Sequence, residues 1–152
     1  MSDDAIRPTF EWLITRGEGV DALVASIRKA ADNSTPELST AALLARTDQG
    51  NPGIAISLML KRVTLHPGKV LYWASGNIHA YLSGLGIELM TSSDNVLRGG
   101  LTPKHIDVLE QLVDVLDFRP IPVPYLAAES LSSRVWAFRP DVPDFVLVRI
   151  ER

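Results

Sequence analysis

The chain has 152 residues, 46% of them hydrophobic and 22% charged, which is the composition of a globular protein rather than of a disordered segment. Its formal net charge of −3 argues against nucleic acid or an anionic membrane as the main partner, since both favour a basic surface, and no apolar run approaches the roughly 18 residues of a membrane span. The absence of cysteine excludes disulfides and thiolate metal sites and fits a cytoplasmic, reducing compartment.

Residues 1–52 are predicted to form a helical segment. Apolar residues recur at helical spacing over 9–31, and the glycines of 17–19 divide this stretch into two helices. Proline at the first position predicts a third, short helix over 36–44, and turn-forming residues predict a loop at 48–53. The positions expected to face the core of the first two helices are Phe10, Leu13, Ile14, Val20, Leu23, Val24, Ile27 and Ala31.

Residues 53–152 are predicted to be mainly β. Strands are expected at the end of the apolar run 57–65 and at 70–73, 80–82, 87–90, 136–138 and 145–150. Short strands at such regular spacing indicate an antiparallel sandwich or barrel.

One helix near 103–117 is expected within this β portion. Thr102 supplies a capping hydroxyl and Pro103 occupies the first helical position. The final strand reaches Arg152 without a closing partner. We therefore expect an incomplete barrel whose open sheet edges permit self-association.

His79 is the first candidate for chemistry, since it follows a glycine turn at the start of a predicted strand. Neutral imidazole is a common zinc ligand. A catalytic zinc ion normally takes three protein ligands, however, and no second histidine follows at ligand spacing. A structural role for His79 is therefore the alternative.

Arg98 and Lys104 form a candidate anion site. Lys104 lies in the first turn of a predicted helix, where the helix dipole disfavours a cation unless an anion is bound. The guanidinium group of Arg98 suits phosphate or enediolate oxygens. The alternative is that both are solvated surface charges.

Glu88, Asp94 and Tyr81 lie in the same part of the sequence. Glu88 and Asp94 could serve as acid or base. Alternatively, Asp94 belongs to a turn and Glu88 is the partner of Arg98. Tyr81 could line a pocket or simply pack its ring as a strand residue.

The stretch from Gly76 to Met90, continued over 93–104, closely resembles the signature of type I mannose-6-phosphate isomerases. The shared elements, at fixed spacing, are His79, Glu88, Ser93-Asp94-Asn95, Arg98 and Thr102-Pro103-Lys104. Thr91 and Gly99 depart from the family pattern, and neither departure removes a reactive group.

The resemblance implies a cupin-type (jelly-roll) β-sandwich preceded by a helical segment. It also implies a zinc-assisted interconversion of mannose 6-phosphate and fructose 6-phosphate through a cis-enediol. His79 matches the zinc-ligand histidine and Arg98 the active-site arginine. Tyr81, Asp94 and Lys104 match positions that line the substrate pocket. Glu88 and Lys104 are the candidates for moving the proton, and the sequence leaves both open.

The family's other zinc ligands, a Gln-x-His pair and a glutamate, have no counterpart in this sequence. The resemblance therefore implies a central or C-terminal fragment of the enzyme. On its own, such a chain is expected to be inactive and to hold zinc poorly. The alternative is a non-catalytic cupin-like module that binds sugar phosphate or another protein.

Overall fold

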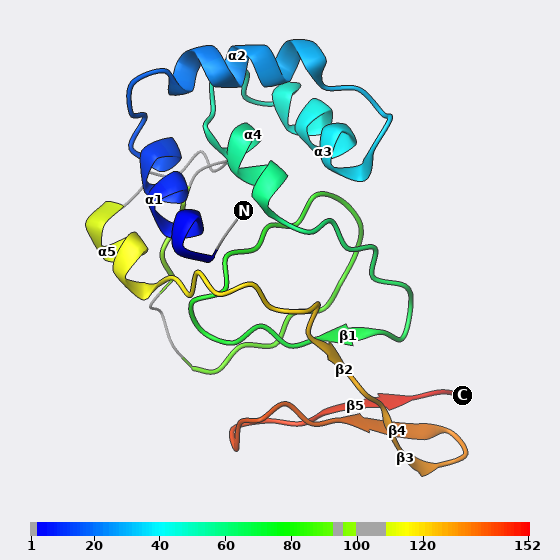
Figure 1. Ribbon diagram of the computed structural model, residues 1–152. Coiled ribbons are helices and arrows are strands. Elements are labelled where there is room, and N and C mark those ends of the chain that lie inside the picture. The colour runs from blue at the N-terminus through cyan, green and yellow to red at the C-terminus, as the bar shows by residue number, and fades with distance from the viewer. Residues whose placement is uncertain (1–2, 93–95, 100–108) are drawn as a thin grey trace. The chain divides into compact units, whose positions relative to one another are not determined.

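The computed structural model describes residues 3–92, 96–99 and 109–152. Most of the helices precede most of the strands along the chain (Figure 1). The helices are α1 (Asp3–Ile14), α2 (Val20–Ala30), α3 (Pro36–Ala45), α4 (Gly53–Ile56), the 3₁₀ turn η1 (Ser57–Met59) and α5 (Leu109–Val115). The strands are β1 (Val70–Leu71), β2 (Tyr125–Leu126), β3 (Glu129–Ser132), β4 (Val135–Phe138) and β5 (Leu147–Ile150).

Two compact units make up the chain, and each is built from three separate stretches of sequence. The first comprises Met1–Arg62, Ser75–His79 and Val96–Pro120. The second comprises Val63–Ala74, Ala80–Asn95 and Ile121–Arg152. The expected boundary at residue 52 separates a helical from a β portion in sequence order, whereas the two units group residues by contacts in space. The boundary therefore stays a prediction. Across the described ranges, no helix is both long and apolar enough to cross a membrane.

α2 and α3 form where the sequence predicts them, whereas α1 begins at Asp3, six residues before the predicted stretch 9–31. α1 ends in two bonds that reach back into its last turn, from Arg16 N to Leu13 O at 3.2 Å and from Gly17 N to Trp12 O at 2.9 Å. This pair of bonds is a Schellman motif, which satisfies carbonyls that a helix end leaves unpaired. α3 begins at a capping residue, Thr35, whose side chain accepts a hydrogen bond from the third residue of the helix.

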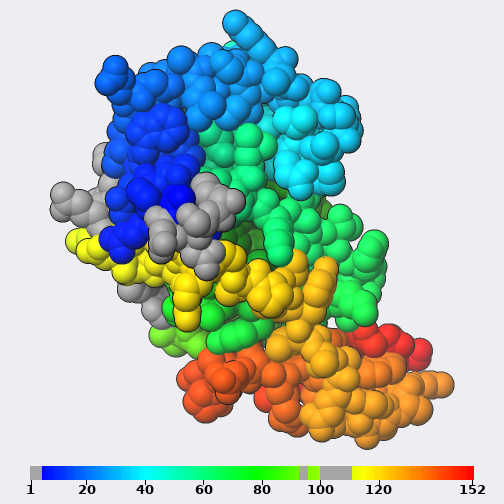
Figure 2. All heavy atoms as spheres, viewed as in Figure 1, coloured from blue at the N-terminus to red at the C-terminus, as the bar shows by residue number. Residues whose placement is uncertain are grey.

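Side chains from α1, α2, α3, α4 and α5 form the core of the first unit. Its buried side chains are Phe10, Leu13, Ile14, Val20, Val24, Ala41, Ile54, Ala55, Ile56, Leu112 and Val113. Most of the apolar positions predicted for α1 and α2 belong to this cluster, although Leu23 is 37% exposed. α1 and α5 lie side by side (Figure 2), and the ring of Phe10 contacts that of Phe118 with centroids 5.5 Å apart.

The second unit contains two small antiparallel sheets. β1 pairs with β2, with Val70 opposite Leu126. β4 lies between β3 and β5, with Trp136 opposite both Ser130 and Arg149. The combination of helices with antiparallel strands that close no barrel within the described ranges agrees with the predicted fold class.

Several expected strands are absent from the described residues. The run 57–65 begins as η1 and continues without a strand, and residues 80–82 and 87–90 also form none. A strand exists only when its backbone bonds to a neighbouring strand, and none of the described strands pairs with these segments. α5 confirms part of the helix expected at 103–117, and residues 100–108 lie outside the described ranges.

Candidate active site

A glycine turn fixes the segment that carries His79 against the end of α5. The backbone of Gly76 has φ +84°, a left-handed conformation that favours glycine. Its carbonyl accepts a hydrogen bond from Asp117 N at 2.9 Å. A Cβ at this position would lie 2.7 Å from Val115 O, so the close approach of the two backbones also requires glycine. The segment 75–79 is therefore held by backbone contacts within the first unit.

The side chain of His79 is exposed, and Nδ1 lies 3.0 Å from Asn77 O. Because a carbonyl oxygen only accepts, this contact is a hydrogen bond in the tautomer that carries the hydrogen on Nδ1. In the neutral ring the lone pair is then on Nε2. A histidine whose other ring nitrogen donates to a carbonyl is the usual form of a metal-ligating histidine.

Arg98 belongs to the same unit and lies in a segment that packs against the histidine turn. A Cβ on its neighbour Gly99 would lie 2.9 Å from Leu112 Cδ2 and 3.9 Å from Ile78 Cδ1. Ile78 and Leu97 both pack on the core cluster of the first unit. The residues next to His79 and Arg98 in sequence are therefore neighbours in space, and the half-buried Arg98 side chain projects from this shared support.

The second unit pairs Tyr81 with Glu88. The tyrosine hydroxyl donates a hydrogen bond of 2.9 Å to Glu88 Oε1. Partial removal from water raises the pKa of Tyr81 above its ordinary value of 10.0, and the bond to the carboxylate raises it further. The pairing of Glu88 with Arg98, which belongs to the other unit, stays a prediction. The prediction that Tyr81 only packs its ring is thus incomplete, because its hydroxyl holds a carboxylate.

Asp94 and Lys104 lie outside the described residues, so their roles stay predictions. Among the described residues, no three histidine, cysteine, aspartate or glutamate side chains gather closely enough to hold a metal ion. His79 thus fits one position of a metal site, and the part of the chain that is described supplies no full ligand set.

The comparisons with known proteins agree with the signature. No family model matches the chain. The mannose-6-phosphate isomerase of Rattus norvegicus is 40% identical over 106 residues, which are 67% of this chain and 25% of that enzyme. The mannose-6-phosphate isomerase of Escherichia coli is 37% identical over 101 residues, 66% of this chain and 26% of that enzyme. The Salmonella typhimurium enzyme, solved with fructose 6-phosphate and zinc, superposes with a TM-score of 0.84 at 30% identity over 95% of this chain.

The chain belongs to the mannose-6-phosphate isomerase family. Its cupin-type fold follows from the same superposition. The chain spans 25% to 26% of the length of these two curated relatives and 38% of the solved Salmonella typhimurium chain. It therefore corresponds to a part of a mannose-6-phosphate isomerase.

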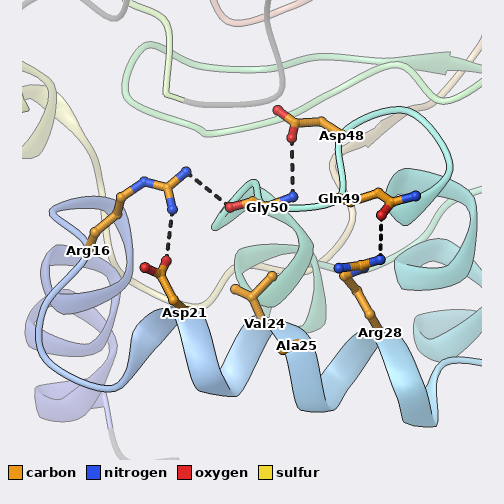
Figure 3. A pocket seen from close by; sticks show the side chains of 8 residues that line it. All are labelled: Arg16, Asp21, Val24, Ala25, Arg28, Asp48, Gln49 and Gly50. Atoms are coloured by element: carbon orange, nitrogen blue, oxygen red, sulfur yellow. Dashed lines mark hydrogen bonds and ion pairs between the residues drawn. The ribbon is translucent and has the colours of Figure 1, made fainter.

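One pocket of this isomerase-family chain is lined by none of the signature residues. A cavity of about 320 Å³ opens in the first unit beside α2 and the loop 48–50 (Figure 3). Arg16 bonds to Asp21 at 2.9 Å and to Gly50 O at 3.0 Å, and Arg28 bonds to Gln49 at 2.7 Å. The charged side chains that line this pocket all have hydrogen-bond partners within the same unit, including Asp48, which accepts from Gly50 N and Asn51 Nδ2, so we assign it a structural role.

Sequence reasoning missed Arg149, which organises the second unit of this family member. Its guanidinium carbon lies 4.3 Å from the ring centroid of Trp136, and Nη1 donates a hydrogen bond of 3.1 Å to Gly68 O. The alternation of 147–150 places Arg149 and Trp136 on one face of the predicted sheet, which was the available signal. The contact with Gly68, 81 residues away, had no signal in the sequence.

Proposed function

We propose that the chain supplies the histidine and arginine side of a zinc-dependent mannose-6-phosphate isomerase active site. The substrates would be mannose 6-phosphate and fructose 6-phosphate, interconverted through a cis-enediol. The hydrogen bond from His79 Nδ1 to Asn77 O carries this proposal, because it leaves Nε2 as the metal-binding nitrogen. The sequence match to named isomerases and the zinc and fructose 6-phosphate of the Salmonella typhimurium structure support it.

Each signature residue has a definite task in this proposal. His79 holds the metal through Nε2, and zinc, when bound, polarises the sugar oxygens. Arg98 offsets the negative charge that develops on the enediolate oxygens. The support under both residues is shared, since their neighbours Ile78 and Leu97 both pack on the core of the first unit.

The proton must move between C2 and C1 of the sugar, and Glu88 or Lys104 carries it. The Tyr81 hydroxyl donates a hydrogen bond to the Glu88 carboxylate and so helps to position it. Tyr81, Asp94 and Lys104 line the sugar-phosphate pocket in this proposal. The enzyme would work in the cytoplasm, consistent with the absence of cysteine.

The isolated chain is proposed to be inactive. Among its described residues the chain offers one candidate ligand, His79, and no group of three, whereas a catalytic zinc site takes three protein ligands. The test is isomerisation of mannose 6-phosphate by the purified chain with zinc supplied, together with its zinc content. We expect no turnover and less than stoichiometric zinc. Turnover above a control without enzyme, or stoichiometric zinc in the monomer, would contradict this part of the proposal.

The assigned roles are tested in a complete enzyme, made by fusing the chain to the unmatched part of the Salmonella typhimurium isomerase. His79→Ala is expected to lose zinc, whereas Arg98→Ala is expected to keep zinc and lose about 10²–10³-fold in kcat. His66→Ala and Arg28→Ala are the matched controls and should behave as the parent enzyme. An inactive complete enzyme that still binds mannose 6-phosphate would favour the non-catalytic binding module instead.

A further inference from the structure

The turn that carries His79 is held by a backbone donor that lies just beyond a helix. α5 ends at Val115, and Asp117 N donates a hydrogen bond of 2.9 Å to Gly76 O. In a continuing helix this N–H group would instead bond to the carbonyl four residues earlier. Because the helix has ended, the direction of the Asp117 N–H group depends on other contacts.

The side chain of Asp117 turns back on its own backbone. Its Oδ1 accepts a hydrogen bond of 3.0 Å from Arg119 N, two residues along the chain. This arrangement is an Asx turn, which fixes the backbone between the two residues. The guanidinium group of Arg119 adds bonds from Nε to Oδ1 at 2.9 Å and from Nη2 to Oδ2 at 2.6 Å. The carboxylate therefore holds residues 117–119 in one conformation.

The residue in the middle of this turn anchors it to the core. Phe118 packs on the core cluster of the first unit, and its ring centroid lies 5.5 Å from that of Phe10 on α1. The guanidinium carbon of Arg7, also on α1, lies 5.8 Å from the centroid of the same ring. The turn is thus attached to α1 as well as to α5, so its direction is defined within the unit.

We propose that Asp117 is a positioning residue for His79. Its carboxylate maintains the Asx turn that directs Asp117 N at Gly76 O, and this bond keeps the histidine turn in place. Asp117 contacts neither metal nor substrate in this proposal and acts only through the backbone. The metal-binding task of His79 rests on the proposed function, whereas the holding of its turn does not.

The exposure of the ion pair separates positioning from general stability. The side chain of Arg119 is 84% exposed and that of Asp117 is 26% exposed, and exposed ion pairs contribute little to the stability of a fold. The bond that closes the turn comes from Arg119 N, and an asparagine side-chain oxygen also accepts such a bond. Asp117→Asn and Arg119→Ala should therefore keep the turn, whereas Asp117→Ala should lose it.

The experiment compares these three variants with the parent by NMR spectroscopy of the 152-residue chain. Hydrogen exchange of the amide at position 117 reports on its bond to Gly76 O, and the nitrogen chemical shifts of the His79 ring report on the histidine turn. The amide of Val24, a buried residue of α2, reports on the stability of the unit as a whole.

Asp32→Ala provides the matched control. Asp32 forms the same kind of turn, in which its Oδ1 accepts a hydrogen bond of 2.9 Å from Ser34 N. This turn lies in the connection between α2 and α3, so its loss removes an Asx turn without touching the support of His79.

We expect Asp117→Ala to accelerate exchange at position 117 about tenfold and to shift the signals of the His79 ring, while exchange at Val24 stays as in the parent. Asp117→Asn, Arg119→Ala and Asp32→Ala should match the parent in all three readouts. Unchanged exchange at position 117 in Asp117→Ala would overturn the proposal. An equal acceleration at Val24 would overturn it too, because the aspartate would then have only a general structural role.

Zinc binding by the complete fused enzyme separates this inference from the proposed function. Asp117→Ala is expected to weaken zinc binding about tenfold, and Asp117→Asn should restore the parent affinity. If His79→Ala lost zinc and Asp117→Ala bound it as tightly as the parent, the positioning role would be wrong and the proposed function would stand. If His79→Ala kept its zinc, the proposed function would fail, and the exchange data on the chain alone would still decide whether Asp117 holds the turn.

Discussion

Replacing Gly76 by alanine tests how the histidine segment is held. Gly76 has φ +84°, and an alanine there adopts a left-handed conformation at a cost of about 1 kcal/mol. In addition, the new Cβ would lie 2.7 Å from Val115 O and 3.1 Å from Asp117 N. These are backbone atoms and cannot rotate away, so the segment must shift. Overpacking of this kind costs about 1–3 kcal/mol.

The shift also threatens the 2.9 Å bond from Asp117 N to Gly76 O, which contributes about 1 kcal/mol. Together these effects predict a loss of about 3–5 kcal/mol in the free energy of unfolding of the first unit. Gly19 provides the matched control. It has a similar φ of +87°, but a Cβ there would meet nothing within 4 Å. Gly19→Ala should therefore cost only the conformational part, about 1 kcal/mol.

The assay is urea denaturation of the parent chain and the two variants, followed by far-ultraviolet circular dichroism, because all the described helices belong to the first unit. The difference between the two variants isolates the contact with the end of α5. If Gly76→Ala destabilised the chain no more than Gly19→Ala, the proposed anchoring of the histidine segment would be wrong.

Two titrations test local electrostatics. The side-chain and backbone bonds from Arg119 lower the pKa of Asp117 from 3.8 to about 2. This carboxylate therefore stabilises the folded chain above pH 4 and loses that effect as the pH falls toward 2. Asp117→Asn should flatten the dependence of the chain's stability on pH over this range, and an acid denaturation profile unchanged from that of the parent would contradict the assignment. Glu88→Gln should lower the pKa of Tyr81, because it removes the carboxylate whose bond and charge contribute to raising it. Tyrosine ionisation is followed by ultraviolet absorbance, and the Tyr81→Phe variant shows which part of the titration belongs to Tyr81. A titration of Glu88→Gln identical to that of the parent would refute the pairing.

Several features follow from the sequence because their causes are local. The glycines at 17 and 19, the capping Thr35 and the helical spacing of Phe10, Leu13 and Val24 act within a few residues, so the helices α1 to α3 and much of their core could be predicted. The family could be predicted too, since the signature around His79 and Arg98 is itself a sequence pattern.

Tertiary structure alone decided the features that depend on distant partners. The segments 80–82 and 87–90 carry the apolar alternation of strands, yet no described strand pairs with them, because sheet formation requires a neighbour that the local sequence does not specify. The Arg149 contact with Gly68 and the packing of Ile78 and Leu97 on the core of the first unit arise in the same way. The sequence by itself thus determined the family and predicted which residues carry the chemistry. The fold decided that the turn bearing His79 and the segment bearing Arg98 share one support, because long-range packing is set by the whole core rather than by any single stretch of it.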